Sequence, residues 1–187
     1  MKFVLFICMY IIALPIEASW QEEVIHENNN FLLSSNASIS VNGIPHVFYK
    51  GRYLYHSYLD NTNWVQEKID GYLDFGIERT PNSTGEIAAA VGPDNKLHVV
   101  YRSNLDHLKY AVWSGGAWIV TETPLVVGRA GKGVGDIKVD TQGVLHVIYI
   151  SQEANQAGDI TDYLEHATFN GESWSRQAID TSISPSK

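Results

Sequence analysis

The hydrophobic pattern of the chain alternates with a period of two residues in short segments, most clearly near its C-terminal end. Ile137–Asp140, Leu164–Phe169 and Trp174–Ile179 alternate apolar and polar side chains, whereas Leu145–Ile150 is continuously apolar. Turn-forming residues separate these segments, and Asn170-Gly171 is the strongest hairpin signal among them. This order predicts four short β-strands that tight turns join into one antiparallel sheet.

The same order of segments occurs three times along the chain. Each copy has a His-Val-x-Tyr run, then a second run that begins with leucine, and then a tryptophan. The His-Val-x-Tyr runs begin at His46, His98 and His146, and the tryptophans are Trp64, Trp118 and Trp174. A period of about 50 residues, with several strands in each copy, is typical of propeller blades or solenoid repeats. Because no segment beyond the N-terminal one has a sustained helical period, the predicted fold class is all-β.

Each predicted sheet carries apolar residues on both faces. In the third copy, Val147 and Tyr149 point to one face while His146 and Ile148 point to the other. Sheets that stack face to face around an axis cover both faces, with the first strand innermost and the tryptophan strand outermost. We therefore predict a β-propeller-like fold of three four-stranded antiparallel blades, at about residues 37–70, 86–123 and 136–180.

A further segment, residues 20–26, resembles the tryptophan strand of the first copy, because Trp20, Glu23 and Ile25 match Trp64, Glu67 and Ile69. It is predicted to be an additional outer strand that precedes the three blades. Three blades are too few to close a ring in one chain, since propellers have four or more. Three interpretations stay open: a fragment of a six- or seven-bladed protein, a ring shared between copies as a homo-oligomer, or an open stack.

The first 18 residues have the features of a secretory signal peptide. Lys2 precedes an apolar run, Pro15 interrupts any helix, and Ala18 is a small residue suited to cleavage. The apolar run is shorter than the ~20 residues that span a bilayer. We therefore expect a secreted chain whose folded part is residues 19–187. Because Cys8 is the only cysteine, that part has no disulfide and depends on its core.

The formal net charge is −8 and the basic residues are scattered, which argues against nucleic acid or an anionic membrane as a partner. Two sequons, at Asn36 and Asn82, are candidate N-glycosylation sites.

The repeat follows the pattern I-x-V-D-x-x-G-x-x-H-V-x-Y, then L-x-Y-A and a tryptophan, and it resembles secreted propellers of the sialidase-like or BNR-like type. That resemblance implies a propeller fold of six or seven blades. Sialidases carry Asp-boxes and an arginine triad, but Val139–Gly143 lacks the serine and the tryptophan spacing of such a box. The five arginines do not occupy equivalent repeat positions: Arg52, Arg79, Arg102, Arg129 and Arg176. We therefore assign no catalytic residue.

The recurring histidines His46, His98 and His146 suggest two interpretations. Three neutral imidazoles bind zinc when they converge at about 2.1 Å on one point, but equivalent positions in successive blades are rotated around the axis. We therefore predict no metal and a structural role, with each imidazole buried between blades and bonded to a turn backbone. His56 and His166 occupy the position of Tyr110 and are predicted to pack as aromatic rings.

Gly128–Gly135 is glycine-rich, but it lacks the order of a P-loop and is predicted to be an inter-blade loop. No two carboxylates can be assigned to a glycosidase pair from the sequence. The connections depart most from the repeat and are the expected places for a ligand site. They are Ser103–His107, Ser151–Asp159, Gly71–Glu86 and Pro124–Asp136.

The sequence favours a secreted, non-catalytic recognition module that binds glycan or an extracellular protein, needs no cofactor, and has ligand-binding residues that the sequence does not specify. One alternative is part of a carbohydrate-active propeller enzyme, a glycosidase or lyase. The other is a propeller remnant or assembly unit without a ligand.

Overall fold

The computed structural model describes residues 35–50, 53–71, 87–103, 107–127, 133–154 and 159–180. Within these ranges all the regular elements are β-strands. None of the described residues form a helix long and apolar enough to span a membrane. The predicted signal peptide and the predicted outer strand at residues 20–26 lie outside the described residues.

In the described ranges, twelve strands form three antiparallel sheets of four, each in chain order, which confirms the predicted fold class. Blade 1 consists of β1 (Ser35–Val41), β2 (Ile44–Lys50), β3 (Leu54–Asp60) and β4 (Asn63–Asp70). Blade 2 consists of β5 (Ile87–Val91), β6 (Leu97–Arg102), β7 (His107–Trp113) and β8 (Trp118–Val126). Blade 3 consists of β9 (Val134–Val139), β10 (Leu145–Ala154), β11 (Ile160–Phe169) and β12 (Trp174–Asp180).

Tight turns connect the strands within each blade where the sequence places residues that tolerate left-handed backbone. Asn42 and Gly43 both have positive φ, 51° and 80°, which is the requirement of a two-residue type I′ hairpin between β1 and β2. At the turn between β11 and β12, Gly171 has φ of 97°, and Asn170 Oδ1 accepts hydrogen bonds from the backbone N–H groups of Glu172 and Ser173. These turns hold the register that places the repeat positions side by side.

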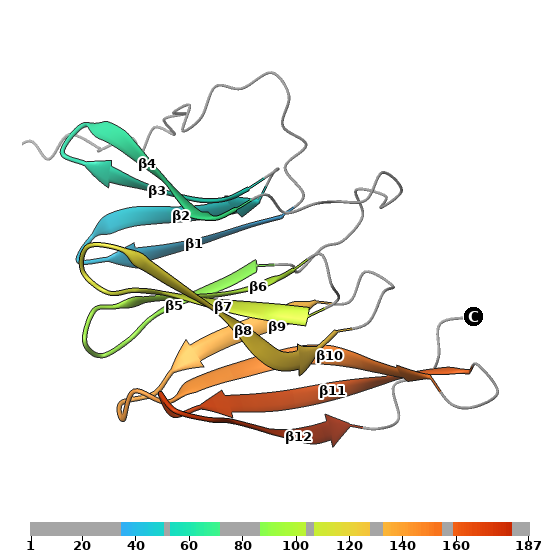
Figure 1. Cartoon of the computed structure of the whole chain (residues 1–187). Helices are drawn as coiled ribbons and strands as arrows, with labels where there is room; N and C mark the ends of the chain where they lie inside the picture. The colour runs from blue at the N-terminus through green and yellow to red at the C-terminus, as the bar shows by residue number, and fades with distance from the viewer. Residues whose placement is uncertain are drawn as a thin grey trace, which may run out of the picture.

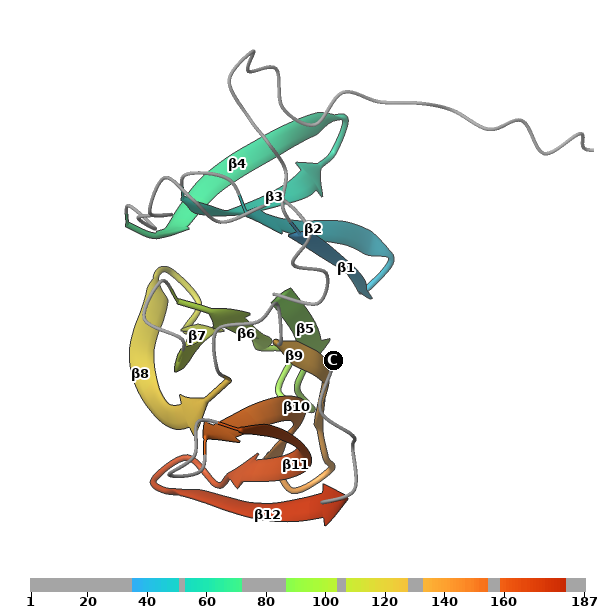
Figure 2. The same ribbon diagram turned by 90° about the vertical axis from the view of Figure 1, so that its right-hand side faces the viewer.

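The three blades stack face to face with their first strands adjacent (Figures 1 and 2). β5 contacts both β1 and β9, so these three strands lie next to the common axis, and β4, β8 and β12 are outermost. In blades 2 and 3, we call the face that is turned toward the preceding blade the leading face, and the opposite face the trailing face. In blade 1, the trailing face is the one turned toward blade 2.

The hydrophobic core is divided between the two blade interfaces. Phe48, Leu54 and Val99 belong to the cluster between blades 1 and 2, whereas Val100 and Val147 belong to the cluster between blades 2 and 3. Val99 and Val100 are neighbours on β6, point to opposite faces and are both fully buried. Blade 2 is therefore covered on both sides, as the apolar pattern of both its faces requires.

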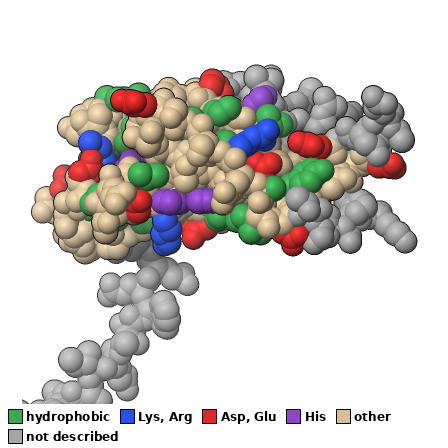
Figure 3. All heavy atoms as spheres, turned by 90° about the horizontal axis from the view of Figure 1, so that it is seen from below, with side chains coloured by type: hydrophobic (Ala, Val, Ile, Leu, Met, Phe, Trp, Pro, Cys, Tyr) green, Lys and Arg blue, Asp and Glu red, His purple; other side chains and the backbone are tan. Residues whose placement is uncertain are grey.

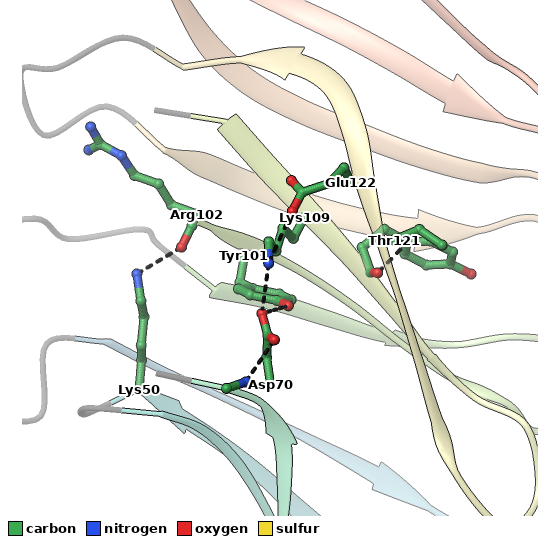
Figure 4. A network of polar contacts seen from close by, with 9 residues as sticks. Lys50, Asp70, Tyr101, Arg102, Lys109, Thr121 and Glu122 are labelled. Carbon is green, nitrogen blue, oxygen red and sulfur yellow. Dashed lines mark hydrogen bonds and ion pairs between the residues drawn. The ribbon is translucent and has the colours of Figure 1, made fainter. Parts of the chain in front are cut away.

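A polar seam joins blades 1 and 2 where β4 meets β6 and β7 (Figure 4). Tyr101 Oη donates a hydrogen bond of 2.6 Å to Asp70 Oδ2, and Lys109 Nζ lies 3.2 Å from the same oxygen and 3.1 Å from Glu122 Oε1. Burial alone would raise the pKa of Asp70, but hydrogen bonds from Tyr101, the Gly71 N–H and Lys109 hold it below its ordinary value. The seam is internally paired, so we assign it a structural role in holding the two blades together.

Candidate functional site

Each blade carries a pair of aromatic rings on its trailing face. One ring lies on the second strand of the blade and the other on the third, and the two rings are hydrogen-bonded to each other. His46 Nδ1 lies 2.9 Å from His56 Nε2 in blade 1, and His146 Nδ1 lies 3.0 Å from His166 Nε2 in blade 3. In blade 2, His98 Nδ1 lies 2.7 Å from the hydroxyl of Tyr110. The two histidine pairs are nearly parallel, at 4° and 6°, with ring centroids 5.1 and 5.2 Å apart.

The structure confirms one sequence prediction for the histidines and contradicts another. His56 and His166 do pack as aromatic rings, as predicted. The hydrogen-bond partner of the recurring histidines is a ring on the next strand rather than a turn backbone, because Nδ1 points across the sheet and not along the chain. Across the described ranges, no group of three or more His, Cys, Asp or Glu side chains is placed to share a metal ion.

The next blade covers the ring pairs of blades 1 and 2. The indole of Trp118 stands edge-on to His56, with centroids 5.3 Å apart and planes at 76°, and its Nε1 donates to Glu67 Oε2 at 3.2 Å. Trp174 and Phe169 of blade 3 pack edge-on against Tyr110 in the same way, at 6.2 and 5.6 Å. The equal spacing of Trp118 and Trp174 within their repeats therefore places each indole against the ring pair of the preceding blade.

Burial under these tryptophan strands changes the ionisation of the covered rings. Desolvation lowers the pKa of His56 to about 4, and the Glu67 carboxylate only partly opposes this effect. Desolvation also lowers the pKa of His98 and raises the pKa of Tyr110 to about 12. Both covered pairs are therefore neutral at physiological pH.

The ring pair of blade 3 is open, because among the described residues no further blade lies on this trailing face (Figures 1 and 3). The His146 side chain is 37% exposed, and its Nε2 lies 3.3 Å from Oδ2 of Asp140. Figure 3 shows histidine side chains next to one another on this face, with charged side chains close by. A shallow open pocket of about 190 Å³ adjoins the pair, and its lining consists of His166, Thr168, Ser175, Arg176 and Gln177.

Asp140 connects this site to the turn between β9 and β10. Its Oδ1 accepts hydrogen bonds from the backbone N–H groups of Gln142 and Val144, at 2.8 and 2.9 Å. The bond from Val144, together with those from His146 and Gln142, lowers the pKa of Asp140. The carboxylate is thus held in place, ionised, beside the imidazole of His146.

The strand register allows the trailing faces to be compared position by position. The row through the first ring of each pair is Ile39–His46–Tyr58–Val65, Ala90–His98–Val112–Ile119 and Lys138–His146–Thr168–Ser175. The row through the second ring is Ala37–Phe48–His56–Glu67, Ala88–Val100–Tyr110–Thr121 and Asp136–Ile148–His166–Gln177. In the first row the three positions beside the histidine change from mainly apolar in blades 1 and 2 to polar or charged in blade 3. In the second row only the inner-strand position changes in this way, from alanine to Asp136.

This change marks the trailing face of blade 3 as the candidate site. Thr168 and Ser175 stand where blades 1 and 2 have Tyr, Val or Ile, and their hydroxyl oxygens lie 2.8 Å apart. The sequence prediction did not include these residues because it expected a site in the connections rather than within the strands. A comparison of repeat positions on one face would have found them.

The predicted connections are only partly loops. β10 and β11 pair as far as Ala154 and Ile160, so most of the described part of Ser151–Asp159 extends the hairpin rather than forming a loop. Val134 and Gly135, from the glycine-rich segment, belong to β9. Asn36 lies on β1 opposite Tyr49, and Asn82 lies outside the described residues, so glycosylation at either stays a prediction.

No protein-family model matches the sequence, and a search of curated proteins finds no match. Among solved structures, AofleA from Arthrobotrys oligospora is similar, with a TM-score of 0.53 and 17% identity over 79% of this chain and 42% of AofleA. A variant of AofleA with three arginines replaced by alanine gives 0.51 and 19% over the same shares. A fucose lectin from Kordia zhangzhouensis in complex with methyl-fucoside gives 0.45 and 13%, over 78% of this chain and 99% of the lectin.

These similarities concern the fold. The described residues form a β-propeller-like stack of three blades, which is not a closed ring. It spans less than half the length of AofleA.

Proposed function

We propose that this chain is a secreted, non-catalytic recognition module that binds glycans through the trailing face of blade 3. The observation that carries the proposal is the polar surface around the open His146–His166 pair, at positions that are mainly apolar in the other blades. Its imidazole, hydroxyl and amide groups are hydrogen-bonding partners suited to the hydroxyl groups of a sugar.

The size and charge of the site also favour a small polar ligand. A pocket of about 190 Å³ is below the range of about 300–1,000 Å³ that accommodates drug-sized molecules. Asp140 is held by its own turn and by His146, which is a positioning role rather than that of a catalytic acid. We therefore favour binding over hydrolysis at this face.

The proposal rests on the chain's own side chains, and the solved structures decide only which sugar is tested first. Since a fucose lectin in complex with methyl-fucoside shares a related stack, fucosides are the first compounds to screen. Secretion rests on the N-terminal sequence pattern alone. Assembly of copies into a ring and kinship with sialidase-like repeats stay predictions.

The test is a panel of immobilised glycans, beginning with α-L-fucosides, probed with the full chain and with a Thr168→Val/Ser175→Val variant. The variant gives both positions the valine that Val112 and Val65 supply in the other blades, and it adds one side-chain heavy atom at position 175 and none at position 168. We expect at least one glycan to bind the wild type and to lose at least tenfold in affinity with the variant. If the folded wild-type chain binds none of the glycans, glycan binding is refuted. If the wild type and the variant bind equally well, this site is refuted.

A further inference from the structure

The two histidine pairs have the same ring geometry but contact their carboxylates at opposite ends. In blade 1 the carboxylate belongs to Glu67, and it contacts the second ring, since His56 Nδ1 lies 3.2 Å from Glu67 Oε2. In blade 3 the carboxylate belongs to Asp140, and it contacts the first ring through His146 Nε2. Gln177 occupies the position in blade 3 that Glu67 occupies in blade 1.

A carboxylate only accepts hydrogen bonds, so it determines which nitrogen of a neutral imidazole carries the proton. In blade 1, His56 Nδ1 must donate to Glu67, and His56 Nε2 is then left to accept from His46 Nδ1. Donation therefore runs from His46 to His56 to Glu67. Trp118 Nε1 donates to the same carboxylate oxygen, so Glu67 Oε2 already has two donors within the protein.

In blade 3 the same rule reverses the order. His146 Nε2 must donate to Asp140, so His146 Nδ1 accepts, and His166 Nε2 is the donor. His166 then has no proton on Nδ1, and this nitrogen is a hydrogen-bond acceptor. Its ring lines the pocket together with Gln177, Thr168 and Ser175.

We propose that the ring pair of blade 3 has this reversed proton order and that Nδ1 of His166 accepts a hydrogen bond from a hydroxyl group of the bound sugar. This inference rests on the proposed function for its ligand, but not for its proton order. It assigns Asp140 a positioning role, because the carboxylate acts on the ligand only through His146. It also explains why blade 3 has Gln177 where blade 1 has Glu67, because a glutamate at position 177 would draw the proton to Nδ1 of His166.

The proton order is measured on the ligand-free full chain with 15N-labelled histidine at pH 7.5. Long-range 1H–15N correlation separates protonated from unprotonated ring nitrogens, and single His→Gln variants supply the assignments. We expect a proton on Nδ1 of His46 and His56, and on Nε2 of His146 and His166. A proton on Nδ1 of His166, as arises if His146 is an imidazolium that donates to both neighbours, would overturn the proposal.

A double variant, Asp140→Asn with Gln177→Glu, transfers the carboxylate of blade 3 to its place in blade 1. We expect the protons of both rings to move to Nδ1 and the affinity for the glycan found in the panel to fall at least tenfold. Unchanged tautomers in this variant would show that the carboxylates do not set the order, and unchanged glycan affinity would refute the acceptor role of His166. If no glycan in the panel binds, the proposed function is refuted, and the tautomers measured on the ligand-free chain still test the proton order.

Discussion

The ring pairs of blades 1 and 3 are built from the same two histidine positions, yet their surroundings differ. In blade 1, Trp118 packs edge-on against His56, both imidazoles of the pair are neutral at pH 7, and His56 is bonded to Glu67. The pair of blade 3 lies at the surface beside Asp140, with hydroxyl and amide groups around it. The comparison shows that one repeat position packs between two blades where it is covered and lies at the surface where no described residue covers it.

The largest expected effect is on the covered pair. Trp118→Ala removes the indole that packs against Phe48 and His56. It also removes the indole N–H that donates to Glu67. We expect the free energy of unfolding, measured with urea, to fall by about 3 kcal/mol, as for other large-to-small changes at aromatic core positions. Gln177→Ala, on the open face, is the control and should cost less than about 0.5 kcal/mol. Similar losses for the two variants would contradict the distinction between covered and open pairs.

The second-largest expected effect is a loss of stability in acid, which arises at the covered pair. The pKa of His56 is about 4 in the folded chain, against an ordinary value of 6.5. Above pH 6.5 both folded and unfolded states carry a neutral imidazole, and the stability is fully present. As the pH falls from 6.5 to 4, the unfolded chain binds a proton that the folded chain does not, so stability declines by roughly 2–3 kcal/mol. His46 and His98, whose pKa values burial also lowers, act in the same direction.

The matched variant is His56→Tyr, because blade 2 already has Tyr110 at this position, bonded to His98. Urea unfolding at pH 7 and pH 4.5 should show that most of the acid sensitivity disappears in this variant. An undiminished loss of stability would place the acid sensitivity elsewhere in the chain.

The polar seam between blades 1 and 2 should give a smaller effect. Tyr101→Phe removes the hydroxyl that donates to Asp70 while keeping the buried ring. We expect a loss of about 1.5 kcal/mol, the lower end of the range for a hydrogen bond to a charged group, because this bond is only partly buried. A double-mutant cycle with Lys109→Met, which shares the same carboxylate oxygen, should give a coupling of at least about 0.5 kcal/mol. Strict additivity would mean that the seam is not one network.

The smallest effect on stability is expected at the open face. Thr168→Val/Ser175→Val removes a hydrogen bond between two exposed hydroxyl groups and should change the free energy of unfolding by less than about 0.5 kcal/mol. The same variant is expected to lose glycan binding. Thermal unfolding by circular dichroism checks the first statement, and a large destabilisation would show that these hydroxyl groups support the fold rather than a ligand.

Periodicity was sufficient to predict the blades, because Ile137, Val147 and Trp174 occupy repeat positions whose burial follows from strand alternation. The ring pairs were not predictable in this way, since the register that brings His46 opposite Tyr58 and next to His56 depends on the length of the connection between β2 and β3. The open site was missed for a different reason. Thr168 and Ser175 are ordinary polar residues of an alternating strand, and only the comparison with Tyr58 and Val65 on the equivalent face shows that they are unusual.

The most direct test of the account is the rate at which diethyl pyrocarbonate modifies each histidine at pH 7, followed by mass spectrometry with and without the glycan identified in the panel. We predict that His146 and His166 react at least tenfold faster than His56 and His98, and that the glycan slows only the first two. Equal rates for all four residues, or no protection of His166 by a bound glycan, would contradict the assignment of the open pair as the binding site.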